Sequence, residues 1–137
     1  MWVFECTETT TAAPAAVWER WTRPECWAEH DEGMEWARLR GPLAVGSKIE
    51  LKPSGGPKST VTISRLAPLT AFSTQGRLPG CRLTIDHEIT AGDGLSEFTH
   101  RITMRGVTAP VFRRAFGNDL AAGLPAMLAS IARLAEQ

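Results

Sequence analysis

The segment from Thr108 to the C-terminus constrains the fold more than any other part of the sequence. Apolar residues recur there at helical spacing and fall on one arc of roughly half the helix circumference. They are Phe112, Phe116, Leu120, Leu124, Met127, Leu128, Ile131 and Leu134. Thr108 suits a helix cap and Pro110 a first turn, which predicts one amphipathic helix of about 26 residues. Pro125, close to Gly123, predicts a bend in this helix.

The chain before this helix has mostly strand patterns. The expected strands are residues 2–10, 34–40, 46–53, 58–66, 70–78, 81–90 and 95–105. Short breaks rich in Gly and Pro separate the last six, which predicts sequential antiparallel hairpins. Residues 12–21 and 24–30 instead predict two short helices, each with a proline in its first turn. We therefore expect an α+β fold in which a curved antiparallel sheet of about seven strands wraps around the long C-terminal helix.

Composition narrows the function classes. The 137 residues suit one domain. The 15 basic and 15 acidic side chains give a formal net charge of zero, so the chain has no excess of positive charge to bind nucleic acid. No apolar run approaches the length of a membrane span, and no secretory signal precedes the first strand. Cys6, Cys26 and Cys81 are odd in number and widely spaced. These features predict a cytoplasmic protein with reduced thiols and no membrane span.

Several local strings resemble one superfamily. They are Pro14-Ala15-Ala16-Val17-Trp18 with Trp27, the Gly41-to-Ser47 turn, Gly106, and Gly123-Leu124-Pro125. Together with the element order they resemble the START-like, or SRPBCC, superfamily, in its polyketide cyclase/dehydrase and lipid-transport group. The resemblance covers residues 1–137 and implies a single domain with a helix-grip fold and an apolar cavity between sheet and helix. His30 stands where that group usually has a second tryptophan, in a region expected near the cavity wall.

Two histidines lie in alternating strand patterns. His87 shares a face with Leu83, Ile85 and Ile89, and His100 shares a face with the apolar residues of the following strand. A two-residue turn at Gly92-Asp93 would place His87 opposite Phe98 and make the two imidazoles diagonal neighbours, about 7–8 Å apart by Cα. They are candidates for an acid–base pair, because the histidine pKa lies near neutrality. The alternative interpretation is that they are hydrogen-bonded residues of the core.

Aromatic residues from several elements are candidates to line the cavity. With the histidines, the candidate ligand-binding residues are Trp27, Trp36, Phe72, His87, Phe98, His100, Phe112, Arg113 and Phe116. Arg113 lies beside the apolar arc, as either a guanidinium at the cavity mouth or a chain that covers apolar surface. A metal site is not expected, since two histidines without a third ligand at suitable spacing do not make one. No cofactor is expected either.

Three functions are compatible with these patterns. The first is binding of a small hydrophobic or aromatic molecule between the sheet and the C-terminal helix. The alternative is a polyketide cyclase/aromatase or dehydratase with His87 and His100 as acid and base, and Arg113 holding an oxyanion. A third is a protein-interaction module with a filled interior. The sequence leaves open whether the chain forms a homodimer.

Overall fold

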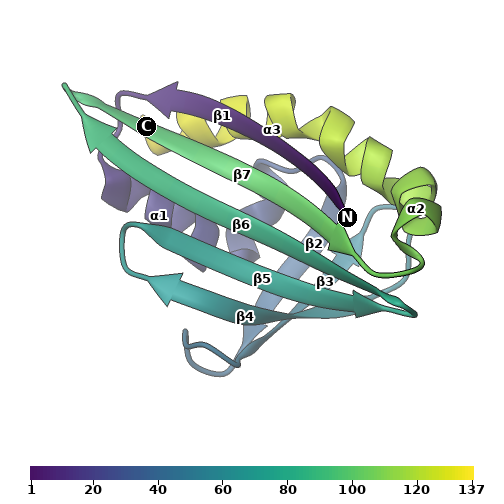
Figure 1. The fold of residues 1–137 in the computed structure, drawn as a ribbon. Helices are drawn as coiled ribbons and strands as arrows, with labels where there is room; N and C mark the ends of the chain where they lie inside the picture. Colours follow the sequence, from purple (N-terminus) through teal and green to yellow (C-terminus); the bar gives the residue numbers. More distant parts are fainter.

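A seven-stranded antiparallel sheet forms the body of the molecule in a computed structural model that describes residues 1–137 (Figure 1). Its order is β1-β7-β6-β5-β4-β3-β2, so the first two strands of the chain form opposite edges. The strands are β1 (Trp2–Thr10), β2 (Met34–Arg40), β3 (Lys48–Pro53), β4 (Ser59–Ala67), β5 (Ala71–Leu78), β6 (Cys81–Gly92) and β7 (Leu95–Arg105). The predicted helix-grip fold is confirmed.

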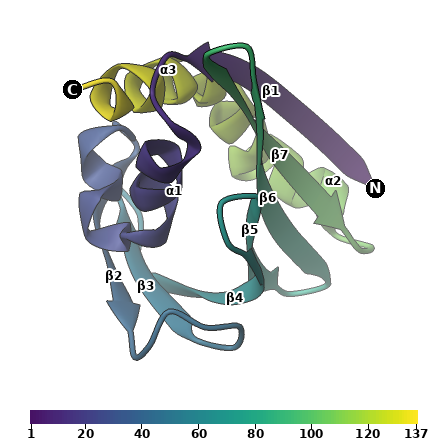
Figure 2. The same ribbon diagram turned by 90° about the vertical axis from the view of Figure 1, so that its left-hand side faces the viewer.

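The helices lie together on the concave side of the sheet (Figure 2). They are α1 (Pro14–Thr22), the 3-10 helix η1 (Pro24–Glu29), α2 (Ala109–Phe112), the π-helical turn η2 (Arg113–Gly117) and α3 (Asn118–Ala135). The two short helices after the first strand therefore form as the sequence predicts. None of the helices is long and apolar enough to cross a membrane.

The C-terminal helix contains an irregular turn that the sequence did not predict. The π-helical turn η2 precedes α3, which then continues through Gly123 and Pro125, where we expected a bend. Gly117 ends that turn at a close contact, because a Cβ there would lie 3.0 Å from Met104 Cε and 3.1 Å from Trp2 Cζ3. The irregular turn η2 is therefore the place where the C-terminal segment packs tightly on β1 and β7. Such π turns are frequent at functional sites.

The main core lies between the sheet and the helices α1 and α3. Its fully buried side chains include Val17 and Trp21 from α1, Phe72 and Phe98 from the sheet, and Leu128 from α3. A second, smaller cluster of Cys81, Met104 and Ala109 lies where the C-terminal helix begins. The concave face is therefore packed in two separate groups.

The start of the C-terminal segment is attached to the hairpin between β5 and β6. Thr108 precedes α2 but does not cap it with its side chain; its hydroxyl donates instead to the carbonyl of Pro79, at 2.6 Å. Gly106 has φ +132°, and a Cβ there would clash with the backbone of Gly80. Only glycine suits this crossing, because L side chains rarely adopt such a φ.

The hairpin of β6 and β7 has a different register from the one predicted. The turn residues are Asp93 and Gly94, both with positive φ, and Gly92 pairs with Leu95. Asp-Gly is a favoured pair for a type I′ turn, because both of its residues must adopt positive φ. The predicted turn at Gly92-Asp93 was thus one residue early, and the predicted pairing of His87 with Phe98 was wrong.

Candidate functional site

His87 and His100 face each other directly across β6 and β7. Both project to the concave side and are only 8% and 2% exposed, and their ring centroids lie 4.4 Å apart. The prediction that they share the helix-facing side is confirmed, while the predicted diagonal spacing is replaced by direct opposition. The shift of register brings the two imidazoles closer than the sequence indicated.

Each imidazole uses one nitrogen in a hydrogen bond with the protein. His87 Nδ1 lies 2.9 Å from the carbonyl oxygen of Phe72, and since a carbonyl only accepts, Nδ1 carries the proton. Trp21 Nε1–H donates to His100 Nε2 at 3.0 Å, so this nitrogen is unprotonated and His100 carries its proton on Nδ1. The remaining nitrogens are therefore opposite in kind: Nε2 of His87 accepts and Nδ1 of His100 donates.

Nε2 of His87 and Nδ1 of His100 make no side-chain hydrogen bond within the protein. The one fully enclosed side-chain polar atom that lacks a partner is Nε of Arg20. A ligand oxygen would find one hydrogen-bond acceptor and one donor side by side.

Burial keeps both imidazoles neutral. Desolvation lowers the pKa of His87 to about 4, against smaller opposing effects of its bond to Phe72 and of nearby Asp86. Desolvation also lowers the pKa of His100 well below its ordinary value, and repulsion from His87 and His30 adds to this. The tautomers derived from the hydrogen bonds are those of uncharged rings, so geometry and electrostatics agree.

Two further buried residues belong to this region: Trp21, which no sequence pattern linked to the histidines, and His30, which was expected near the cavity wall. Trp21, from α1, is 1% exposed and packs at an angle against both imidazoles, with ring centroids 5.1 Å from His87 and 5.6 Å from His100. His30 is buried at the end of η1, and its pKa falls to about 3 through desolvation and the charge of Arg20, which donates to its Nδ1 at 3.1 Å. The i, i+3 spacing of Trp18 and Trp21 indicated a buried face, but not contact with a strand pair about 80 residues later.

The other predicted lining residues divide into groups. Phe72 and Phe98 are fully buried beside the histidines, and Trp27 is half-buried and donates its indole N–H to the carbonyl of Trp21 at 3.0 Å. Phe112 and Phe116 pack in the smaller cluster, with ring centroids 6.0 Å apart. The structure therefore does not bring all the predicted aromatic residues into one wall.

Two predicted lining residues lie elsewhere. Trp36 is on the outer face of the sheet, with the guanidinium carbon of Arg38 4.6 Å from its ring centroid, so its prediction as a cavity residue was wrong. Trp36 alternates with the buried Ala37 and therefore lies on the face of β2 that carries Arg38. Arg113 is exposed in the π turn and forms no ion pair; its place at a cavity mouth stays a prediction.

Several apolar side chains of the concave side are only half-buried. Ile85 and Leu83 continue the inward row of β6 beyond His87, and Leu120 and Met127 belong to α3. Leu83, Leu120 and Met127 pack against the main core. No group of three or more His, Cys, Asp or Glu side chains has the geometry to hold a metal ion.

Comparison with known proteins identifies the architecture. No protein-family model matches the sequence, and no curated protein matches it. A solved structure from Mesorhizobium loti has a TM-score of 0.76 at 15% identity, over 97% of this chain and 96% of its own. Norcoclaurine synthase from Thalictrum flavum, solved with dopamine and hydroxybenzaldehyde, has a TM-score of 0.72 at 14% identity. The match covers 97% of this chain and 85% of the norcoclaurine synthase chain. The chain has a START-like, helix-grip fold.

A third solved structure has a similar fold. DynU16, a protein of the dynemicin biosynthetic locus, has a TM-score of 0.72 at 19% identity, over 98% of this chain and 47% of its own length. The resemblance inferred from the local strings is thereby confirmed at the level of fold. At these identities the similarity concerns the START-like fold, and activity depends on the site itself.

Proposed function

We propose that this protein binds a small, largely apolar molecule that carries a hydroxyl or carbonyl oxygen, on the concave side of the sheet beside His87 and His100. The observation that carries the proposal is the pair of neutral imidazoles, 4.4 Å apart, with one free acceptor and one free donor nitrogen. A START-like fold with half-buried apolar side chains next to that pair supports the same conclusion.

The chemistry of the site favours a neutral ligand. Apolar contact supplies about 25 cal/mol for each Å² removed from water, so a small aromatic ring already gains useful affinity. A hydroxyl can donate to Nε2 of His87 and accept from Nδ1–H of His100, whereas uncharged imidazoles do little to offset desolvation of a carboxylate. Phenols and ketones therefore suit the site better than ionised fatty acids. Norcoclaurine synthase, which shares the fold, was solved with phenolic compounds of this kind.

Matched probes test the proposal. We expect 1-naphthol to bind more tightly than naphthalene, by roughly tenfold, because one additional hydrogen bond contributes about 1 kcal/mol or slightly more. Isothermal titration calorimetry on both probes measures this preference. In the double variant His87→Phe/His100→Phe, naphthalene binding should persist and the preference for 1-naphthol should disappear.

A neighbouring hydroxyl provides the control. Thr74 lies on the concave face opposite Ile85, is buried, and is replaced by valine with little change of shape. Thr74→Val should keep the preference for 1-naphthol, because both imidazoles remain. Equal affinity of the wild-type protein for the two probes, or a preference that survives loss of both histidines, would show that the imidazoles do not bind the ligand oxygen.

The acceptor–donor pair also supports a second candidate, an enzyme for aldol-type ring closure of a poly-β-keto chain. Nε2 of His87 would take a proton from a carbon between two carbonyls, and Nδ1–H of His100 would stabilise the enolate oxygen. The enolate carbon would then bond to a second carbonyl carbon, and the proton on His87 would pass to the new alkoxide. A base works best with a pKa near the working pH, and the pKa of His87 is about 4. Binding without turnover is therefore the first proposal.

Deuterium exchange separates the two candidates. The probe is 1-phenylbutane-1,3-dione in D₂O, whose exchange at the carbon between its carbonyls is followed by NMR. An enzyme should accelerate exchange above the buffer rate, and His87→Gln should abolish the acceleration because an amide is not a useful base. Exchange at the buffer rate despite saturation with the probe would exclude the base role and leave the binding role.

A further inference from the structure

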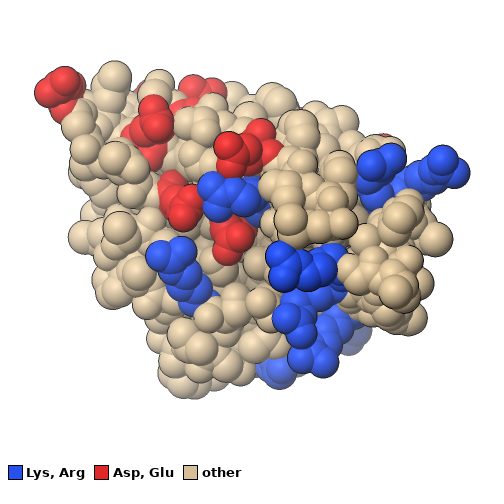
Figure 3. Space-filling view, viewed as in Figure 1, with Lys and Arg blue, Asp and Glu red and all other residues tan.

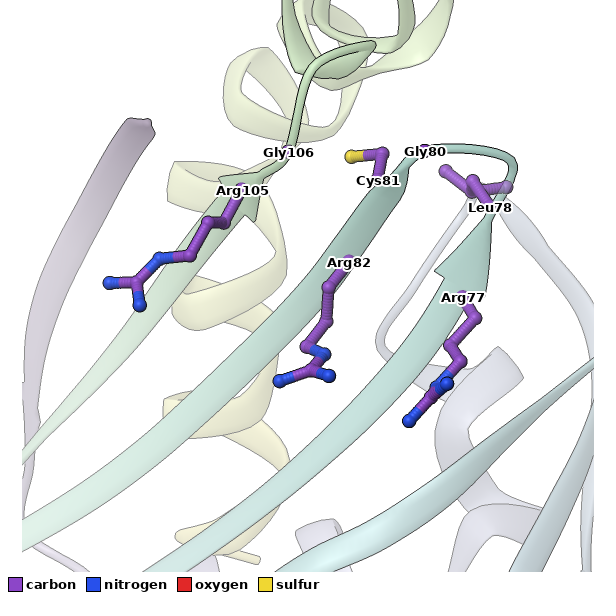
Figure 4. Close-up of a pocket in the computed structure, with 7 residues that line it drawn as sticks. All are labelled: Arg77, Leu78, Gly80, Cys81, Arg82, Arg105 and Gly106. Atoms are coloured by element: carbon purple, nitrogen blue, oxygen red, sulfur yellow. The ribbon is translucent and has the colours of Figure 1, made fainter.

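Three arginines lie side by side on the outer face of the sheet. Arg77 of β5 pairs with Arg82 of β6, and Arg82 pairs with Arg105 of β7. Their side chains leave the same end of three neighbouring strands and run in the same direction (Figure 4). We call Arg77, Arg82 and Arg105 the arginine row.

No carboxylate neutralises the arginine row. None of its members takes part in an ion pair, whereas Arg101 on the same face of β7 contacts both Glu5 and Glu88. The positions next along the outer face are the uncharged Gln75, Thr84 and Thr103, which separate the row from those acidic residues. The basic and acidic side chains accordingly gather over different parts of this face (Figure 3).

This arrangement is unfavourable without a counter-ion. Like charges directly opposite each other in a sheet repel, and three such positions are placed in succession here. The polar contact of Arg105 within the protein is Nη2 with Sδ of Met1, at 3.1 Å, which contributes no charge. The guanidinium groups thus keep nearly all their hydrogen-bonding capacity for a group outside the chain.

The row also borders a depression. Its volume is about 430 Å³, and besides the arginines it is lined by Leu78, Gly80, Cys81 and Gly106. The two glycines bring no side chain into this space, so the backbone crossing near the start of α2 leaves it open.

We propose that the arginine row binds a phosphate group of a phosphate ester or diphosphate. A guanidinium binds phosphate oxygens through paired N–H groups, and three in a row match a group with more than one negative charge better than a single carboxylate. The same chemistry is presented by a soluble phosphate ester and by a lipid headgroup. This site is on the opposite face of the sheet from His87 and His100 and is independent of the interior ligand.

Inorganic pyrophosphate is the first probe. We expect it to bind the wild-type protein in calorimetry at low ionic strength, and to shift the Nε–H resonances of the arginine row. Arg82→Gln, which removes the central guanidinium, should weaken binding at least tenfold, since it removes charge-assisted hydrogen bonds. Arg40→Gln is the matched control: Arg40 is an exposed arginine of the same sheet, already paired with Glu50 at 2.6 Å. Its removal should change the affinity less than twofold.

A second arm identifies the source of the phosphate. Vesicles of phosphatidylcholine with and without phosphatidic acid are sedimented with the protein. Binding of pyrophosphate without co-sedimentation supports a soluble ester, and co-sedimentation that needs both phosphatidic acid and Arg82 supports a headgroup. No binding of either probe, or equal weakening by Arg82→Gln and Arg40→Gln, would overturn the proposal, because both variants lower the net charge by one. Thermal unfolding confirms that each variant is folded.

Discussion

The two faces of the central strands treat charge in opposite ways. On the inner face, His87 and His100 lie directly opposite each other, and burial keeps both neutral. On the outer face, Arg82 lies opposite both Arg77 and Arg105, and solvent lets all three keep their charge. Alternation along a strand thus places a desolvated polar pair and a solvated charge cluster on opposite sides of one sheet. The environment, more than the residue type, decides what each group can bind.

Tryptophans on the two faces provide the largest expected contrast. Trp21→Ala should lower the free energy of unfolding by about 3–5 kcal/mol, because it empties a buried aromatic site and removes the partner of His100 Nε2. Trp36→Ala, on the outer face, should cost no more than about 1 kcal/mol, the scale of an exposed cation–π contact. Urea unfolding measures both. Similar costs for the two variants would contradict the assignment of the faces.

Acidification should destabilise the protein through its inner face. The folded-state pKa values of His30, His87 and His100 all lie below that of an unfolded histidine, so below pH 6.5 the unfolded chain binds more protons. Stability is therefore complete above pH 6.5 and falls as the pH is lowered from there towards the folded pKa values. Between pH 7 and 5, His30 and His87 should each remove about 2 kcal/mol from the free energy of unfolding, and His100 should act in the same direction.

Glutamine substitution measures how much His87 and His100 contribute to the pH dependence of stability. Glutamine at position 87 can still donate to Phe72, and at position 100 it can still accept from Trp21. The variant His87→Gln/His100→Gln should lose a large part of the histidine-dependent fall in stability between pH 7 and 5, because of the three histidines only His30 still titrates. An unchanged pH profile would mean that the two imidazoles are already protonated or solvated in the folded protein.

The smallest expected effects lie on the outer face. In phosphate-free buffer of low ionic strength, Arg82→Gln should raise the free energy of unfolding by about 0.2–1 kcal/mol, because it relieves repulsion across both strand pairs. Arg101→Gln should lower it by up to about 1 kcal/mol, since Arg101 contacts Glu5 and Glu88. Both differences should shrink as salt is added. If both substitutions change stability in the same direction, the outer charges are not organised as described.

The sequence carries most of the fold because its signals are local. Strand alternation, prolines in first turns and one long apolar arc predict the order of the elements, and the ends of β1, β2 and β7 agree with the expected ranges. The errors arise where the face or the exact position of a residue is needed. Asp93-Gly94 forms the turn one residue later than expected, and Trp36 lies on the outer face, opposite in direction to the buried Ala37.

The candidate site is less predictable, because contacts distant in sequence create it. Strand alternation predicts that His87 and His100 face inward, but their protonation depends on Phe72 and Trp21. No local pattern links Trp21 in α1 to His100 in β7. The arginine row likewise depends on the pairing of three strands, since each of its members looks like an ordinary exposed arginine in the sequence.

Nitrogen-15 NMR of the histidine rings shows whether a neutral imidazole pair holds a ligand oxygen. At pH 7 we expect both rings to be neutral, with protons on Nδ1 of His87 and Nδ1 of His100. Titration with 1-naphthol should shift Nε2 of His87 and Nδ1 of His100 strongly and the other two nitrogens weakly. Charged rings at pH 7, or saturation with 1-naphthol that leaves both free nitrogens unmoved, would contradict the account.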